Sequence, residues 1–454
     1  MTKKFKQLAA LCLSLLLLLT GPAFAGAADA QPWYWETLGA NAAAQAGLDG
    51  AGVTVAVIDS GVNRQHADLI GADISGYNFL GRLPDRDVTA FGDDAGHGTL
   101  VAGLLAATPG NGIGADGLTP GASLLMLRCF SALGGSANAG SGAVETVEAA
   151  VRYAIAQGAD VINMSIGGTK AGLQALEPVF QEAADAGILL VAAAGNTGGT
   201  AVYYPAAFDC VTGVGWLSKS GEVSALSQRN ATVFVVAPGD DILGPDYRTE
   251  TGMRTDSGSS FAAPIVSALA IMAKQADPAI DTQAFRTLLQ RCADDLGAPG
   301  YDEAYGYGSV TVSGFVQALR APQPITYDCG GGELLPGDYD TGYQIGVSQV
   351  DLPAAQREGF DFAGWFTDPD CTEPFNGIAP GSIDPLTLYA GWEACPEPEP
   401  EPQEVCPLCG RTHTGFFGRI AAFTHRLIFT LGRMLGFFQN EASFLTRQNM
   451  GVEK

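Results

Sequence analysis

Short apolar segments alternate with alanine-rich segments along the first two thirds of the chain. Five apolar segments are typical of β-strands: residues 53–58, 124–127, 161–164, 188–192 and 233–236. The first four are almost continuously apolar, as expected of strands whose two faces are both buried in a parallel sheet. Helical patterns lie between the strands at 99–107, 144–157 and 178–186. Residues 35–318 are therefore predicted to form one α/β domain, a doubly wound parallel sheet with helices on both faces.

The pattern changes after Pro322. Residues 325–393 are rich in Gly, Asp, Pro and aromatic residues, with short strand-like runs at 343–347 and 386–389. This composition predicts a small, separate β-rich module. Residues 395–405 repeat Pro and Glu, which is typical of an extended spacer that has no core of its own.

The last segment, residues 406–454, reverses the charge of the chain. Six of its residues are Arg or Lys and two are Glu. Its aromatic residues include Phe416, Phe417, Phe423, Phe429, Phe437 and Phe438. A basic aromatic tail on an acidic chain indicates a terminal interaction element. Two interpretations remain open: an amphipathic helix that lies on a membrane or cell wall, and a helix that packs on a partner protein.

The N-terminus has the layout of a signal peptide. Three lysines precede an apolar run over residues 8–19. This run is shorter than the apolar segment that a membrane-spanning helix needs. The small residues Ala23 and Ala25 surround a cleavable bond. We expect residues 1–25 to be removed on export, and the protein to be secreted or held at the extracellular cell surface. An uncleaved N-terminal anchor is the alternative.

The composition narrows the classes of function. The formal net charge is -24, and an acidic surface repels phosphates, so no nucleic-acid partner is expected. Gly is abundant (60 residues) and charged residues make up 16% of the chain, which favours a compact domain with many tight turns. Nine Cys are present, one of them in the predicted signal peptide. Export permits disulfides, but the spacing of these Cys residues defines no pairing.

Four residues at strand ends or helix starts carry the groups that cleave a peptide bond with a serine. This chemistry needs a nucleophile, a base, a carboxylate that orients the base, and donors for the oxyanion. Asp59 and Asn196 each follow a predicted strand. His97 and Ser260 each stand at the start of a predicted helix. Taken singly, each residue also has a purely structural interpretation in a turn or helix cap. His66 lies in a polar turn and is interpreted as structural.

The combined order of these motifs resembles the subtilase family of serine peptidases. The matching segments are residues 55–62, 96–103, 163–167, 192–196 and 258–264. The order Asp, His, Ser along the chain is the order in this family. The resemblance covers roughly residues 35–318. It implies a subtilisin-like fold and a secreted serine endopeptidase that hydrolyses peptide bonds in proteins or peptides.

The resemblance also implies a role for each residue. Ser260 attacks the scissile carbonyl, His97 accepts and returns the proton, and Asp59 fixes the tautomer of His97. Asn196 and the Ser260 amide hold the oxyanion. The implied substrate-binding residues are Ser165, Ile166, Gly167, Ala193 and Gly195. Tyr203 stands where many relatives have a small residue, which implies a shorter specificity pocket and a preference for smaller side chains.

The chain departs from the family pattern in three respects. Ser259 replaces a commoner Thr, and Leu100 stands where many relatives have a second His. Only about a dozen residues separate Ala25 from the region that resembles the mature domain, so the usual inhibitory pro-segment is not evident. The resemblance further implies a structural calcium at Asp68 and Asn111, with a plain turn as the alternative. No cofactor is expected for catalysis, and no metal site is assigned.

Residues 325–393 resemble the Listeria–Bacteroides repeat of bacterial surface proteins. The resemblance lies in residues 325–332, 357–360, 362–365 and 388–392. It implies a small β-grasp-like module for spacing or adhesion, whose Trp and Phe residues belong mainly to its core. The competing function for the whole chain is therefore a catalytically silent protein that keeps the subtilase fold and binds surfaces through this module.

Zinc-type ligands stand at the start of the tail. They are Cys406, Cys409 and His413, with His425 as a fourth. An oxidised cysteine pair or two free thiols explain the same residues equally well, so this site is left open.

Overall fold

The computed structural model describes residues 31–80, 89–131, 140–169, 174–395 and 415–434. The predicted signal peptide, the residues of the spacer after Cys395, and the zinc candidates Cys406, Cys409 and His413 lie outside these residues. Contacts divide the chain into two compact units. The first is Met1–Gly330 with Leu334–Ala355 and Gly364–Ala390, and the second is Gly331–Glu333, Gln356–Ala363 and Gly391–Lys454. Most of residues 325–393 therefore belong to the larger unit by their contacts.

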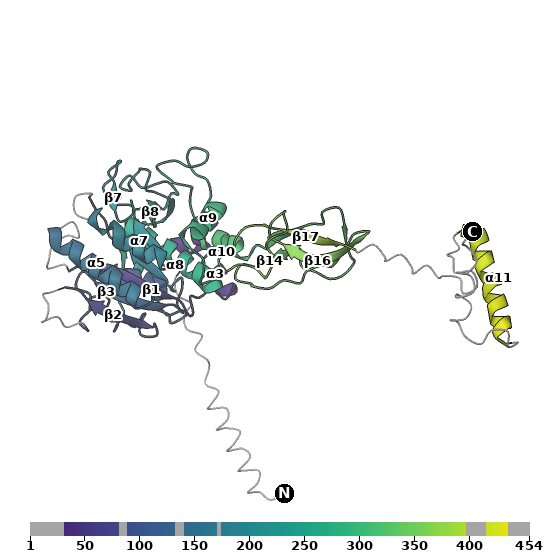
Figure 1. Ribbon diagram of the computed structural model, residues 1–454. Helices are drawn as coiled ribbons and strands as arrows, with labels where there is room; N and C mark the ends of the chain where they lie inside the picture. The colour runs from purple at the N-terminus through teal and green to yellow at the C-terminus, as the bar shows by residue number, and fades with distance from the viewer. Residues whose placement is uncertain (1–30, 81–88, 132–139, 170–173, 396–414, 435–454) are drawn as a thin grey trace, which may run out of the picture. The chain divides into compact units, whose positions relative to one another are not determined.

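Seven parallel strands form the sheet of the first unit, in the order β2-β3-β1-β4-β6-β8-β9. Figure 1 labels four of them, β1, β2, β3 and β8. The strands are β1 (Thr54–Asp59), β2 (Ile74–Asn78), β3 (Ser123–Arg128), β4 (Val161–Met164), β6 (Leu189–Ala193), β8 (Val211–Leu217) and β9 (Val235–Pro238). The predicted strands correspond to β1, β3, β4, β6 and β9. Sequence analysis missed β2 and β8, which contain Gly residues that interrupt their apolar runs.

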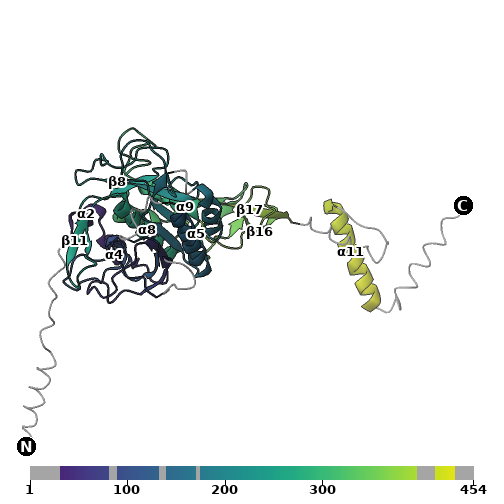
Figure 2. The same ribbon diagram turned by 90° about the vertical axis from the view of Figure 1, so that its left-hand side faces the viewer.

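Helices cover both faces of this sheet and create two hydrophobic cores. Val55 and Val57 of β1 face α4 (His97–Ala106) and α8 (Ser259–Ala276), whereas Ala56 and Ile58 face α5 (Gly140–Ala156) and α7 (Glu177–Asp185). Figure 1 labels α5 and α7, and Figure 2 labels α4 and α8. Burying one Leu, Ile or Phe side chain contributes about 1.5–3 kcal/mol, which explains why these strands are apolar on both sides. The predicted doubly wound α/β fold is confirmed.

Smaller elements complete the first unit. α2 (Trp33–Leu38) and α3 (Asn41–Gln45) precede the sheet, and the strands β10 (Ile242–Pro245) and β11 (Met253–Asp256) form a hairpin. Sequence analysis also missed α9 (Thr282–Cys292) and α10 (Val312–Arg320). Each begins at a side-chain cap: Asp281 accepts from the Ala284 N–H, and Thr311 accepts from the Gly314 N–H. Such caps are readable in a sequence as helix starts.

The C-terminal strands form a four-stranded sheet in the order β14-β12-β17-β16. They are β12 (Gln323–Asp328), β14 (Gly342–Tyr343), β16 (Phe360–Phe366) and β17 (Leu386–Ala394). This confirms a β-rich region, but the strand predicted at 343–347 is wrong after Tyr343, because the chain turns at Gly346 with φ 84°. Trp365 is a core residue, and its Nε1 donates to the Pro353 carbonyl at 2.8 Å.

The tail contains a helix, α11 (Gly415–Met434), which belongs to the second unit. Within the described residues, no helix combines the length and the apolar character needed to cross a membrane.

Candidate active site

The end of β1 and the start of α4 bring Asp59 and His97 together. Asp59 is the last residue of β1 and is 1% exposed, and His97 is the first residue of α4. The Nδ1 atom of His97 lies 2.8 Å from Asp59 Oδ1 and 3.0 Å from Asp59 Oδ2. Because an ionised carboxylate can only accept, Nδ1 carries the proton and Nε2 is left as an acceptor. In this tautomer His97 can take a proton from a hydroxyl group.

The backbone of Ser260 is fixed by a chain of buried hydrogen bonds. Ser260 is the second residue of α8, and its carbonyl oxygen accepts from Ser165 Oγ at 2.6 Å. Ser165 Oγ accepts from Asn163 Nδ2 at 3.0 Å, and Asn163 Oδ1 accepts from Ser267 Oγ at 2.9 Å. These buried side chains tie the first turn of α8 to the end of β4. Sequence analysis placed Ser165 on the substrate edge and did not find this positioning role.

Among the described residues, no hydrogen bond joins the side chains of Ser260 and His97, but the residue after Ser260 contacts the His97 ring. The ring of the next residue, Phe261, lies 5.1 Å from the His97 ring, centroid to centroid. Within the described part of the chain, the His97 ring is hydrogen-bonded to Asp59 alone. Contacts between a catalytic base and its nucleophile are often long in ligand-free proteins and tighten when substrate binds. The triad as a whole therefore stays a prediction, with its Asp–His half formed.

Asn196 is oriented by Ser259, the residue before the predicted nucleophile. Asn196 Oδ1 accepts from the Ser259 N–H at 2.8 Å and from Ser259 Oγ at 2.7 Å. Since its oxygen is occupied, its Nδ2 group remains as the donor. Nδ2 lies beside Gly258, because a Cβ built there would come within 3.0 Å of it. A glycine is needed at this point, where φ is 153°. The arrangement agrees with the predicted oxyanion donor but does not test it.

Asp93 organises the start of α4 behind His97, and sequence analysis did not identify it. Its Oδ1 accepts from Ser60 Oγ and from the N–H groups of Ala95 and Gly96, at 2.8 to 2.9 Å. Its Oδ2 accepts from the N–H and the hydroxyl of Thr99, at 2.9 and 2.6 Å. Ser60 Oγ also accepts from the Gly98 N–H at 2.9 Å. A carboxylate that satisfies the free amides of a helix start holds that start in place.

Replacing Asp93 by Asn should loosen this helix start and reduce turnover. The side-chain nitrogen of the asparagine, itself a donor, would then face N–H and hydroxyl donors. We therefore expect the free energy of unfolding to fall by about 2–3 kcal/mol. A fall of about tenfold in kcat is also expected. The charge of Asp93 raises the pKa of His97, so the acidic limb of the kcat/KM profile should also move to lower pH. Asp94→Asn is the control, since Asp94 pairs with Arg128 instead. An unshifted limb in the Asp93 variant would leave Asp93 with a structural role only.

The electrostatics of the site predict activity at neutral to alkaline pH. Desolvation lowers the pKa of His97, but the charge of Asp59 and its hydrogen bond raise it, helped by Asp256 and Asp93. The net pKa of His97 is above its usual 6.5. Only the neutral ring can accept a proton, so activity should be lost as pH falls through this raised pKa. The pH dependence of kcat/KM with a peptide substrate measures this pKa. A midpoint of the acidic limb below 6.5 would contradict the assignment of His97 as the general base.

The predicted substrate edge lies at the ends of the neighbouring strands β4 and β6. Ser165, Ile166 and Gly167 follow β4, Ala193 ends β6, and Gly195 follows it. Ala193 and Ile166 are buried at 3% and 8% exposure, so their side chains belong to the hydrophobic cores. No ligand contact tests these assignments.

The ring of Tyr203 lies between two residues of this edge. A Cβ on Gly195 would come 3.1 Å from Tyr203 Cδ2, and one on Gly167 would come 3.4 Å from Tyr203 Cδ1. The Tyr203 hydroxyl shares a hydrogen bond with Thr197 Oγ1 at 3.0 Å. Tyr203 itself is in β7 (Tyr203–Tyr204), which pairs with β5 (Gly168–Thr169). The ring is therefore held in the space beside both glycines.

His66 and Leu100 do not belong to the site. His66 is fully buried, with Nε2 2.9 Å from the Gly252 carbonyl and Nδ1 accepting from the Asp68 N–H. Leu100 is a core residue of α4. His66 thus has the structural role that was expected.

The calcium candidates Asp68 and Asn111 lie in contact. Asn111 Nδ2 donates to Asp68 Oδ1 at 2.9 Å, and Asn111 Oδ1 accepts from the Ile113 N–H at 2.7 Å. Calcium needs several oxygens aimed at one centre, whereas this amide turns its nitrogen toward the carboxylate. The described residues contain no group of three His, Cys, Asp or Glu that could hold a metal. Calcium also takes amide and backbone oxygens as ligands, so the predicted calcium at Asp68 and Asn111 stays a prediction.

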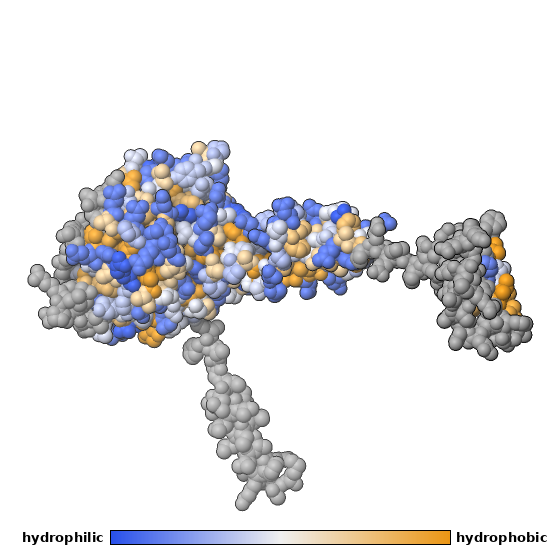
Figure 3. Space-filling view, viewed as in Figure 1, coloured by the Kyte–Doolittle hydropathy of each residue, from blue (hydrophilic) through white to orange (hydrophobic). Residues whose placement is uncertain are grey.

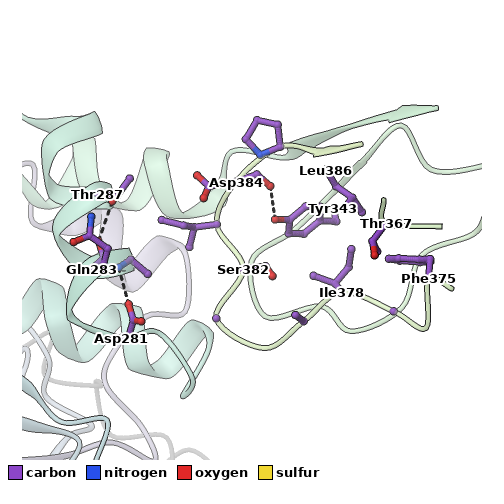
Figure 4. Close-up of a pocket in the computed structure, with 16 residues that line it drawn as sticks. Asp281, Gln283, Thr287, Tyr343, Thr367, Phe375, Ile378, Ser382, Asp384 and Leu386 are labelled. Atoms are coloured by element: carbon purple, nitrogen blue, oxygen red, sulfur yellow. Dashed lines mark hydrogen bonds between the residues drawn. The ribbon is translucent and has the colours of Figure 1, made fainter. Parts of the chain in front are cut away.

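A hollow of about 490 Å³ lies away from these residues, beside α9 (Figure 4). Its lining includes Gln283, Thr287, Tyr343, Ile378 and Ser382. The Tyr343 hydroxyl donates to the Asp384 carbonyl at 2.6 Å, and Asp281 caps α9. The Tyr343 hydroxyl and the Asp281 carboxylate thus already have partners within the protein.

A parallel α/β fold with a hydrogen-bonded Asp–His pair at the end of a strand is consistent with a serine hydrolase. The model of the Subtilase family matches residues 50–308, which is more than half of the chain. The chain belongs to the subtilase family, and this domain is a subtilisin-like serine peptidase domain. The model of the Listeria-Bacteroides repeat domain matches residues 324–391.

Curated relatives agree with this family. The chain is 34% identical over 281 residues to the minor extracellular protease Epr of Bacillus subtilis, covering 62% of this chain and 41% of Epr. It is 34% identical over 276 residues to thermitase of Thermoactinomyces vulgaris, covering 61% of this chain and 90% of thermitase. It is 33% identical over 283 residues to subtilisin Savinase of Lederbergia lenta, covering 62% of this chain and 97% of Savinase. The match thus spans nearly all of two relatives but under half of Epr.

Proposed function

We propose that this protein is an exported endopeptidase that hydrolyses peptide bonds in proteins by acyl transfer through Ser260. The observation that carries the proposal is the pair of Asp59 and His97 at 2.8 Å, in the tautomer needed by a general base. Support also comes from Ser259 and Asn196, whose hydrogen bonds leave an amide donor beside the helix start. The proposed mechanism uses no cofactor.

The proposed reaction follows from these groups. His97 Nε2 takes the proton of Ser260 as its oxygen attacks the scissile carbonyl carbon, and Asp59 stabilises the imidazolium. Asn196 Nδ2 and the Ser260 N–H donate to the oxyanion. His97 then protonates the leaving amine, which departs and leaves the acyl group on Ser260. Water next attacks the acyl carbon and gives its proton to His97, which passes a proton to the Ser260 oxygen as the acid is released.

A fluorophosphonate probe tests this proposal directly. We expect it to label Ser260 in the folded protein, and mass spectrometry of the labelled peptide to place the adduct there. Casein should be cleaved by the wild type and left intact by Ser260→Ala. The rival is a catalytically silent surface-binding protein, which the repeat match supports. Folded protein that neither reacts with the probe nor cleaves casein would favour that rival.

We also infer export and association with the cell surface. The N-terminal pattern over residues 1–25 and the extracellular protease Epr among the relatives support export. The repeat region and the basic tail support retention at a surface. Detection of the mature protein in the culture medium or on intact cells, with residues 1–25 removed, is the expected result.

Tyr203 should restrict the substrate side chain next to the scissile bond. Its ring occupies space between Gly167 and Gly195 that a large side chain would need. In Tyr203→Gly, we expect the ratio of kcat/KM for Phe over Ala at this position to rise about tenfold or more. The control is Val202→Gly, because Val202 precedes Tyr203 and is exposed. An unchanged ratio, measured with matched peptide substrates, would show that the ring lies outside the pocket.

A further inference from the structure

Exposed apolar side chains are concentrated on the helix α11. Of the eleven large apolar residues that are exposed in the described chain, five lie in this helix. They are Ile420 (48% exposed), Phe423 (67%), Leu427 (52%), Ile428 (54%) and Leu431 (48%). Their spacing of three, four, one and three residues places them on one face of an α-helix. Figure 3 shows hydrophobic surface along the visible side of α11. The helix therefore offers a continuous apolar face.

The charge of this region is opposite to that of the rest of the chain. From residue 405 to residue 440 the sequence contains no Asp or Glu, although the whole chain has 48 acidic and 24 basic residues. Arg419, Arg426 and Arg433 follow one another at intervals of seven residues. At about 100° per residue this interval returns to nearly the same side of the helix, beside the apolar face. The helix thus joins a broad apolar face to a basic border.

From this combination we infer that α11 lies flat in the surface of a lipid bilayer that carries anionic lipids. The apolar face would enter the boundary between headgroups and acyl chains, and the arginines would meet the headgroup phosphates. Each part of the helix then has a partner of matching chemistry. The helix would lie along the surface, since its arginines recur through its length and require contact with the headgroups throughout.

Other partners match only half of this chemistry. A polyanion of the cell wall supplies negative charge but has no apolar phase for Phe423 and Leu427. A second copy of this chain supplies acidic residues. However, the exposed large apolar residues that the structure describes on its first unit all lie in loops and turns, and none belongs to an amphipathic helix or strand: Ile70, Val202, Leu226, Tyr301, Val347 and Leu352. An anionic bilayer supplies both the negative charge and the apolar phase. This inference is independent of the proposed peptidase activity.

Sedimentation with lipid vesicles tests the inference on the full chain. Ser260→Ala would be used throughout, so that self-cleavage cannot remove the tail. We expect the protein to pellet with phosphatidylcholine vesicles containing about one quarter phosphatidylglycerol, and much less with phosphatidylcholine alone. Added salt should weaken the binding. The double change Phe423→Ser and Leu427→Ser should lower the partition coefficient about tenfold or more.

A matched control separates the apolar face from hydrophobicity in general. Ile70→Ser with Leu352→Ser removes two exposed apolar side chains from the first unit, and it should leave vesicle binding unchanged. Thermal unfolding of each variant would show that the first unit is intact. Equal binding to both vesicle types would overturn the inference. So would anionic binding that the Phe423 and Leu427 changes do not reduce, or self-association through these residues that occurs without lipid.

Discussion

Replacement of Ser260 by alanine should lower kcat about 10⁶-fold, the order of magnitude known for subtilisin rather than one derived for this chain. The change removes one oxygen atom, and with it the nucleophile. His97 and Asp59 cannot compensate, since they act by moving the proton of the missing hydroxyl. The residual rate would come from substrate binding and the oxyanion donors. Steady-state and single-turnover rates with a peptide anilide measure the loss.

The same substitution should leave the fold unchanged, which makes the kinetic result easy to interpret. The Ser260 carbonyl, not its hydroxyl, receives the hydrogen bond from Ser165, and this bond survives in alanine. The melting temperature should therefore match that of the wild type. Ser257→Ala is the matched control: Ser257 is exposed, precedes the site by three residues and accepts from the Asp241 N–H. Wild-type turnover in Ser260→Ala would end the assignment of the nucleophile.

The class of fold and the site candidates were accessible from the sequence because each depends on local signals. Residues 55 to 58 are apolar without interruption, and the structure sends alternate members to opposite cores. Asp59 ends that strand, and His97 and Ser260 lie at the starts of helices. The ends of strands and the starts of helices therefore indicated the candidate site residues. In a parallel sheet these positions gather at one edge.

The remaining features depend on contacts between distant parts of the chain. Asp93 resembles any polar loop residue until the fold brings Ser60 to it, 33 positions away. The link between Ser260 and Ser165 spans 95 positions. β8 was missed because its glycines hide an entirely buried strand. Most of the repeat-like residues share the larger unit through contacts such as that of Arg291 with Asp384, at 2.5 Å. Local pattern cannot show such pairings.

Replacement of Asp59 by asparagine should lower kcat about 10⁴-fold, the order known for this change in other serine proteases. Asp59 Oδ1 accepts from the Ser60 N–H at 2.7 Å as well as from His97. The amide oxygen of asparagine would therefore take the Oδ1 position and leave its nitrogen 3.0 Å from His97 Nδ1 at the Oδ2 position. A donor there favours the proton on Nε2, so the base loses its acceptor.

This variant should also change the pH profile, in a direction that the electrostatics determine. Desolvation lowers the pKa of His97, whereas the charge and the hydrogen bond of Asp59 raise it. Without the charge, the lowering contribution dominates, and the acidic limb of kcat/KM should move to lower pH as the rate falls. The control is Asp94→Asn, which removes a charge that is paired with Arg128. This variant should have the kcat of the wild type and an unshifted acidic limb of kcat/KM. A slow Asp59→Asn enzyme whose limb stays in place would mean that the carboxylate does not set the protonation of His97.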